Sequence, residues 1–189
     1  MVDEMIKLAL EEAEDRMDKA LDFLRSELAS IRAGRATPAM LEHIKVDYYG
    51  SHTPLNQMAS VSAPQPDLLV IQPWDRSALN DIEKAIMSAN VGVTPSNDGM
   101  IIRVPVPPLS EERRRDLAKT ARSRGEEAKV SIRNLRRHGK DEIKSLQQSE
   151  NLPEDMRYEG EERLQKLTDL HIEKIDDLLD RKEKEIMEV

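Results

Sequence analysis

The chain contains no cysteine, and this absence excludes both a disulfide framework and thiolate chemistry. Aromatic residues make up only 3% of its 189 residues, so any core has to be packed from aliphatic side chains and Met. Such a core is typical of helix bundles. Together with 38% hydrophobic and 35% charged residues, the composition predicts a globular chain rich in exposed helix.

Long apolar runs are also missing. No stretch approaches the roughly 18 apolar residues that a membrane span requires. Acidic residues interrupt the apolar positions near the N-terminus, unlike the start of a signal peptide. We therefore expect a soluble, cytoplasmic protein with no membrane partner.

Motifs for catalysis and cofactor binding are absent as well. The sequence has no phosphate-binding G-x-x-x-x-G-K run and no G-x-G-x-x-G run. Its four histidines, His43, His52, His138 and His171, are scattered and have no Cys partners, which argues against a zinc site. His171 falls on an apolar helix face, where a hydrogen-bonded packing role is expected. The chain is predicted to be no enzyme, with no metal and no other cofactor.

Charge, in contrast, is abundant and unevenly distributed. The net charge is −8, yet residues 113–140 contain 11 Lys or Arg against 3 acidic residues, a local charge of +8. The remainder therefore carries −16. A molecule with this asymmetry attracts a polyanion to one face and repels it elsewhere.

The positive residues lie in a stretch, 111–146, that fits one long helix with two faces. At about 100° of rotation per residue, its apolar residues fall within an arc of roughly 80°, as a buried seam requires. The seam consists of Leu117, Ala121, Ala128, Ile132, Leu135, Ile143 and Leu146. Basic residues fill a neighbouring arc of about 100°. This basic stripe consists of Arg115, Lys119, Arg122, Lys129, Arg133, Arg136, Arg137 and Lys140.

Two interpretations of the basic stripe are open. It can be a solvated face whose members pair with Glu on neighbouring helices, or it can bind a polyanion. Mutual repulsion and the excess of Arg, whose planar guanidinium matches phosphate, favour polyanion binding. Because no aromatic residue interleaves with the stripe, the backbone of a folded RNA fits better than stacked single-stranded bases.

Two further long helices are predicted. Residues 3–31 carry an apolar heptad pattern, and a third periodic segment follows a break at Gln148–Pro153. A single helix cannot bury its own apolar stripe, so each of the three needs partner helices. Residues 1–31 and 109–189 should therefore pack as one discontinuous three-helix bundle, which serves as the RNA-binding arm of a monomer.

Residues 32–108 have a different sequence pattern, with short apolar runs separated by turn residues. We predict strands at Ile44–Tyr49, Asn56–Ser62, Leu68–Gln72 and Met100–Val104, and one helix from Ala78 to Ala89 with Ser77 as its N-cap. The predicted fold class is thus α+β, an elongated three-helix bundle with an inserted small β/α/β domain.

An insertion of this kind is joined to the bundle by two connections, which is the geometry of a hinge. Gly34 permits unusual backbone angles, and the Pro-rich run on the other connection limits slack. We predict hinge segments at 32–38 and 104–108. Their candidate residues are Arg32, Ala33, Gly34, Arg35, Ala36, Val104, Pro105, Val106, Pro107 and Pro108.

Short motifs along nearly the whole length resemble the bacterial ribosome recycling factor family. They are Arg32-Ala33-Gly34-Arg35-Ala36 with Pro38, Val46-Asp47-Tyr48-Tyr49-Gly50, Thr53-Pro54-Leu55, Pro73-Trp74-Asp75, Ile82-Glu83-Lys84-Ala85-Ile86, Asn97-Asp98-Gly99, Pro107-Pro108-Leu109, Glu111-Glu112-Arg113-Arg114, Ile132-Arg133-Asn134-Leu135-Arg136-Arg137 and Gln165-Lys166-Leu167-Thr168-Asp169. Their common order makes the resemblance highly specific.

The resemblance implies an L-shaped, tRNA-like molecule with the helix bundle as one arm and the insertion as the other. It also implies binding to the large ribosomal subunit after termination, where elongation factor G and its GTP hydrolysis drive the splitting of the ribosome into subunits. In that family the bundle contacts large-subunit RNA through arginines that match Arg133, Arg136 and Arg137.

Two hypotheses for the function follow. The chain is either a non-catalytic translation factor that binds ribosomal RNA, or a coiled-coil interaction module whose basic stripe binds an acidic protein. Salt separates them, because phosphate binding weakens steeply with ionic strength and a heptad interface does not.

Overall fold

The computed structural model describes residues 3–31, 35–42, 44–89 and 93–188, so that Arg32, Ala33, Gly34 and His43 lie outside the described residues. The chain divides into two compact units. The helical unit comprises Met1–Ile31 and Arg115–Ile186, and the β/α unit comprises Arg32–Arg114 with Met187–Val189. The α+β class with long helices and a small β domain is confirmed.

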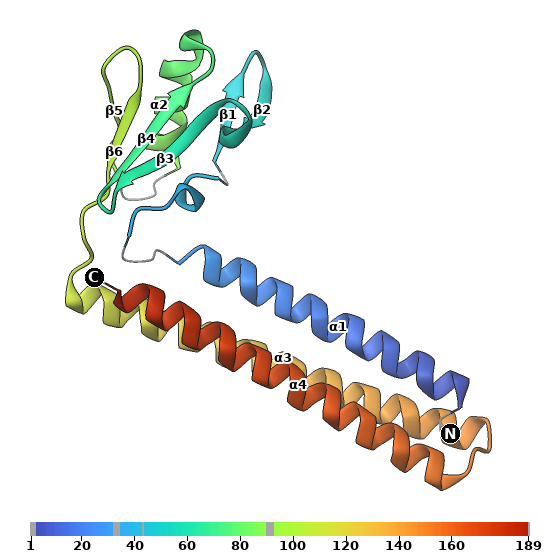
Figure 1. Ribbon diagram of the computed structural model, residues 1–189. Coiled ribbons are helices and arrows are strands. Elements are labelled where there is room, and N and C mark those ends of the chain that lie inside the picture. The colour runs from blue at the N-terminus through green and yellow to red at the C-terminus, as the bar shows by residue number, and fades with distance from the viewer. Residues whose placement is uncertain (1–2, 32–34, 43, 90–92, 189) are drawn as a thin grey trace. The chain divides into compact units, whose positions relative to one another are not determined.

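The helical unit is built from three long helices that run side by side (Figure 1). They are α1 (Glu4–Ala29), α3 (Glu111–Ser149) and α4 (Glu154–Met187). Asp3 caps α1, because its side chain accepts a hydrogen bond from the Met5 N–H at 2.9 Å. Ser110 caps α3, since its Oγ accepts a hydrogen bond from the Arg113 N–H at 3.1 Å.

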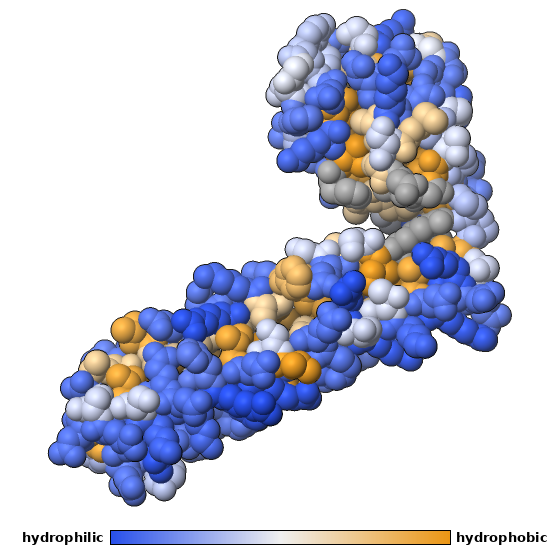
Figure 2. Space-filling model, turned by 180° about the vertical axis from the view of Figure 1, so that it is seen from behind, coloured by the Kyte–Doolittle hydropathy of each residue, from blue (hydrophilic) through white to orange (hydrophobic). Residues whose placement is uncertain are grey.

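The core of the helical unit is formed by the three apolar seams packing on one another. Ile6 and Met17 of α1, Ile132 of α3 and Ile175 of α4 are all fully buried. Every residue of the seam predicted for α3 is either buried in this cluster or packed against it. The face of this unit in Figure 2 is mostly hydrophilic, with apolar side chains emerging in separate groups.

Three glycines let the helices approach closely. A Cβ added at Gly125 would lie 2.3 Å from Leu179 Cδ1, and one added at Gly160 would lie 2.8 Å from Ile6 Cγ2. At Gly139 the nearest side-chain atom would be Leu164 Cδ2, at 3.1 Å. The helix-forming tendency lost at these positions is therefore exchanged for tight packing between helices.

The β/α unit contains two antiparallel sheets and one helix. Strands β1 (Lys45–Tyr48) and β2 (Ser51–Pro54) form a hairpin. A second sheet has the order β3-β4-β6-β5, from β3 (Ala59–Gln65), β4 (Leu68–Pro73), β5 (Ser96–Asn97) and β6 (Ile102–Pro105). Helix α2 (Leu79–Ser88) buries Leu79, Ile82 and Ile86 in one cluster with apolar residues of β4 and β6.

Two details predicted for this unit are wrong. The strand expected at Asn56–Ser62 begins only at Ala59, because Leu55–Gln57 form a 3-10 turn, and β2 precedes that turn. Ser77 does not cap α2, since an extra 3-10 turn at Arg76–Ala78 comes first and Asp75 caps it by accepting from the Ser77 N–H at 2.9 Å. Sequence periodicity does not reveal such short turns.

Both chain connections of the β/α unit are tied to its β3–β4 turn. The Ala36 N–H donates to the Pro66 carbonyl oxygen at 2.8 Å, and the Val106 N–H donates to the Asp67 carbonyl oxygen at 2.7 Å. Ala36, Val104 and Val106 are also buried in the core of this unit. These three predicted hinge residues are thus parts of a packed domain.

Candidate nucleic-acid interface

All eight residues of the predicted basic stripe lie on α3, but four of them contact α4. Arg122 pairs with Glu183, and Lys129 Nζ lies 2.6 Å from Asp176 Oδ1. Further along, Arg136 donates to Gln165 Oε1 at 3.4 Å, and Lys140 Nζ lies 3.9 Å from Glu161 Oε2. Because the two helices are antiparallel, residues later in α3 pair with residues earlier in α4.

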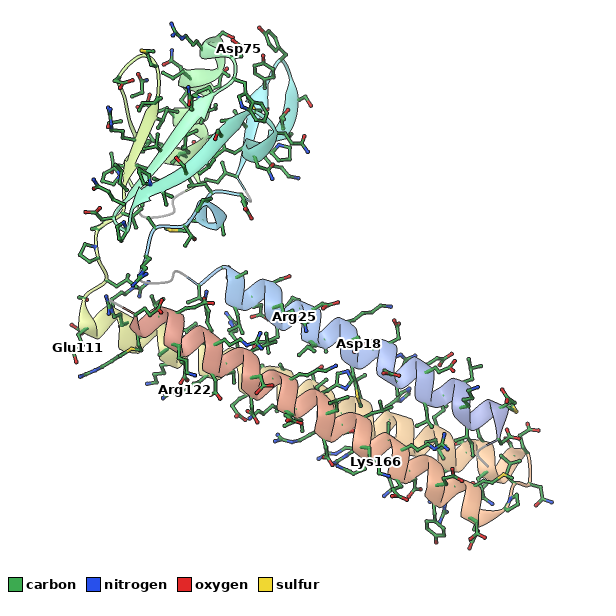
Figure 3. The ribbon with its side chains drawn as sticks, in the orientation of Figure 1. Asp18, Arg25, Asp75, Glu111, Arg122 and Lys166 are labelled. Atoms are coloured by element: carbon green, nitrogen blue, oxygen red, sulfur yellow. The ribbon has the colours of Figure 1, made fainter. Side chains whose placement is uncertain are left out.

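The acidic partners change the electrostatics of this row. The hydrogen bond that Arg122 donates to Glu183 raises the pKa of Arg122, and the hydrogen bond that Lys129 donates to Asp176 raises the pKa of Lys129 against the effect of burial. Figure 3 labels Arg122 on the helical unit. At these positions the interpretation of the stripe as pairs with neighbouring helices is correct.

The structure gives a different picture for Lys119, Arg133, Arg136 and Arg137. Among the described residues, Lys119, Arg133 and Arg137 make no ion pair, and Arg136 has only the neutral Gln165. Arg133 and Arg137 are one turn apart on the same face of α3. The chain therefore places three arginines, at 133, 136 and 137, within about one helical turn without a carboxylate partner in the described structure.

A hollow of about 530 Å³ adjoins this arginine cluster. Arg136, Arg137 and Lys140 line it from α3, and Tyr158 and Gln165 are among the residues that line it from α4. The Arg157 guanidinium lies 4.7 Å from the centre of the Tyr158 ring. The depression thus combines basic side chains, an amide and an aromatic ring with the carboxylates of Glu161 and Glu162.

Two features of this site escaped the sequence interpretation. Tyr158 stands beside the stripe, although no aromatic residue interleaves with it in sequence. The position of Tyr158 follows from the antiparallel pairing of α3 with α4, because that pairing brings the start of α4 to the end of α3. Lys144 is exposed one heptad after Arg137 and extends the outer face, as its seven-residue spacing indicates.

Other kinds of site find no support in the described residues. Within them, no group of three or more His, Asp or Glu side chains is arranged to hold a metal ion. Across the same part of the chain, no helix is long and apolar enough to cross a membrane. On α4, Arg163 and Lys166 pair with Glu159 and Glu162, each one turn earlier.

Comparison with known proteins gives consistent matches over the whole chain. The protein-family model for "Ribosome recycling factor" matches residues 24–187. The ribosome-recycling factor of Salinibacter ruber is 54% identical over 189 residues and is covered over 100% of both chains. That of Halalkalibacterium halodurans is 55% identical over 185 residues, which cover 98% of this chain and 100% of the relative.

Solved structures give the same result. A solution structure of a ribosome recycling factor is similar with a TM-score of 0.85 at 43% identity, over 100% of both chains. A second match consists of models for the T. thermophilus ribosome recycling factor and the E. coli elongation factor G bound to the E. coli post-termination complex. Its TM-score is 0.68 at 46% identity, again over 100% of both chains.

Proposed function

Because this chain belongs to the ribosome recycling factor family, we propose that it binds the post-termination ribosome and, with elongation factor G and GTP, splits it into subunits for a new round of translation. Its place of action is then the cytoplasm. Elongation factor G supplies the nucleotide site in this scheme, and the chain itself acts without catalysis. Consistent with that division, its sequence has no phosphate-binding loop.

We propose that the helical unit contacts large-subunit RNA through Arg133, Arg136 and Arg137. The observation that carries this assignment is the absence of a carboxylate partner for these three side chains among the described residues. An arginine already paired with Glu must give up that pair before it binds phosphate, whereas an unpaired one loses only water. Lys119 and Lys144 extend the same surface, and Arg115 lies on the same face of α3.

The alternative function, a coiled-coil module for an acidic protein, is less well supported. A heptad interface needs an apolar seam that is free to meet a partner. In the helical unit the seams of α1, α3 and α4 are buried in one another. This internal packing also supports a monomer.

Substitution of the arginine cluster tests the proposal. We expect Arg133→Ala and Arg137→Ala each to weaken binding to the large subunit by about tenfold, because one charge-assisted phosphate contact is lost. The slope of log affinity against log salt should fall by about 0.7–0.9 for each contact removed. Sedimentation of the protein with large subunits over a salt series measures both quantities.

Arg122→Ala is the matched control, because it removes the same charge from the same helix at a position that already pairs with Glu183. It should change the affinity less than Arg133→Ala does. Equal losses for the two variants would contradict a specific role for the arginine cluster, and unchanged binding by Arg133→Ala would refute it. A subunit-splitting assay with and without elongation factor G tests the wider function, and the pure protein alone should not hydrolyse GTP.

A further inference from the structure

The β/α unit exposes two large aromatic side chains beside a third, Tyr48, that packs against its core. Tyr49 is 84% exposed and Trp74 is 69% exposed. The ring of Tyr48 meets that of Tyr49 edge to face, with their centres 4.5 Å apart. We call Tyr48, Tyr49 and Trp74 the aromatic surface. In a chain with only one Trp and three Tyr, most of the large rings of this unit thus face solvent.

Hydrogen bonds hold this surface in place. The Tyr48 hydroxyl donates to Asp75 Oδ2 at 2.6 Å, and Asp75 Oδ1 accepts from the Ser77 N–H. The backbone N–H of Trp74 donates to the Met58 carbonyl oxygen at 3.1 Å. Asp75, labelled in Figure 3, therefore joins the β1–β2 hairpin to the segment before α2.

The same hydrogen bonds fix the charge of the surface. The Tyr48 hydroxyl lowers the pKa of the Asp75 carboxyl, and Asp75 in turn raises the pKa of Tyr48 to about 12. Asp75 stays ionised and Tyr48 stays neutral at every physiological pH. The surface thus combines aromatic rings with a permanent negative charge.

Tyr49 occupies a position that folding alone does not favour. It forms the two-residue loop of the β1–β2 hairpin with Gly50, and their φ angles are +48° and +78°. Positive φ at both positions is the type I′ geometry, for which Asn-Gly is preferred. A bulky residue with positive φ is an outlier, and such strain is concentrated at functional sites. Since the Tyr49 side chain is also exposed, its contribution to stability does not explain it.

Charge indicates the chemistry of the partner. Residues 44–89 contain 3 Lys or Arg against 5 Asp or Glu, so the surroundings of the aromatic surface are acidic and unfavourable for phosphate. Ring faces attract cations, above all guanidinium groups. In the helical unit, Arg157 already covers Tyr158, whereas no cation of the described chain lies over the rings of the aromatic surface.

We infer that the aromatic surface with Asp75 is a docking site for a protein segment that presents arginine side chains. A guanidinium of the partner stacks on Tyr49 or Trp74 and donates hydrogen bonds to the Asp75 carboxylate. Trp, Tyr and Arg are the residues that most often dominate binding energy at protein interfaces. The inference rests on the proposed function, because the partner is sought among the proteins present on the ribosome during recycling.

The variant Tyr49→Asn separates docking from folding. Asn suits the loop better, so the unfolding temperature should stay the same or rise, while subunit splitting at limiting protein should fall about tenfold. Met87→Ala is the matched control, since it removes a 58% exposed side chain from α2 of the same unit and should leave splitting unchanged. If wild-type protein fails to split ribosomes, the proposed function is wrong. If wild type splits them and Tyr49→Asn splits them equally well, only the docking site is wrong.

Cross-linking identifies the class of partner. Tyr49 is replaced by benzoylphenylalanine, and the protein is irradiated in complexes assembled from purified ribosomes, elongation factor G and GTP. An adduct with an arginine-containing peptide of a ribosomal protein or of elongation factor G supports the docking site. An adduct with ribosomal RNA, or a bound complex without any adduct, overturns it.

Discussion

His171 is fully buried, yet both of its ring nitrogens are satisfied. Nδ1 lies 2.7 Å from the Leu167 carbonyl oxygen, within α4. Nε2 lies 2.7 Å from Asp18 Oδ1 of α1, and a carboxylate only accepts, so this contact requires a proton on Nε2. The predicted hydrogen-bonded packing role of His171 is confirmed, and Asp18 emerges as its partner across the helices.

Loss of the Asp18 carboxylate should therefore destabilise the protein. Asp18→Ala leaves Nε2 of a buried imidazole without an acceptor, and the free energy of unfolding should fall by about 1–3 kcal/mol. Chemical denaturation measures this change. Asp22→Ala, which breaks only the exposed pair with Arg25 on the same helix, should cost less than about 1 kcal/mol. Equal effects of the two substitutions would show that His171 does not depend on Asp18.

Single residues also mark the limit of what the sequence predicts. Helical periodicity identifies the seams, since residues such as Ile132 and Ile143 repeat at intervals that one face requires. It does not tell which basic residues meet acids on another helix, because Arg122 and Glu183 are brought together only by the register of α3 and α4. The position of Tyr158 beside the stripe depends on the same register.

Among the elements, α4 depends on Gly160 to approach α1. An added Cβ would lie 2.8 Å from Cγ2 of Ile6, a fully buried and β-branched residue that cannot easily swing away. Ala is preferred to Gly within a helix by about 1 kcal/mol, but overpacking costs about 1–3 kcal/mol. We expect Gly160→Ala to lower the free energy of unfolding by about 1 kcal/mol.

A second substitution tests the cause of that loss. Ile6→Leu removes the Cγ2 methyl at nearly constant volume, so the double variant Ile6→Leu, Gly160→Ala should be more stable than the sum of the single changes indicates. Denaturant unfolding of the wild type, the two single variants and the double variant completes this double-mutant cycle. Additive effects, or a Gly160→Ala variant more stable than wild type, would show that the close approach of α1 is not needed.

Elements differ in how well the sequence predicts them. The sequence locates the long helices to within a few residues because each carries many repeats of one pattern. The β/α unit was predicted less well, since β2 and β5 are short and their polar, exposed residues give no alternation. Between β5 and β6 the chain turns at Asp98-Gly99, where Gly99 adopts φ +88°, an angle that few other residues tolerate.

In the whole molecule, we propose that the two units change orientation during subunit splitting. Since Ala36, Val104 and Val106 are packed in the core of the β/α unit, we expect these three residues to move together with that unit. The residues at 32–34 lie outside the described part of the chain.

Distances between spin labels test this motion. Only the introduced cysteines are labelled, because the native chain has none. Labels at Ser123→Cys of α3 and Ser62→Cys of β3 report on the two units, and both sites are exposed. We expect the distance distribution to change when the protein binds post-termination ribosomes with elongation factor G. A pair at Ser123→Cys and Ser145→Cys, both on α3, should stay constant. An unchanged distribution for the first pair would contradict a functional hinge.

The discontinuity of the helical unit also determines the order in which the chain can fold during its own synthesis. Helix α1 leaves the ribosome first, but its apolar side packs on helices from Arg115–Ile186, which are made last. At about 5–20 residues per second, α1 waits on the order of ten seconds or more for its partners. Almost all of the β/α unit is complete by Arg114, so it can fold within that interval. The first helix to be synthesised is therefore among the last elements to be buried.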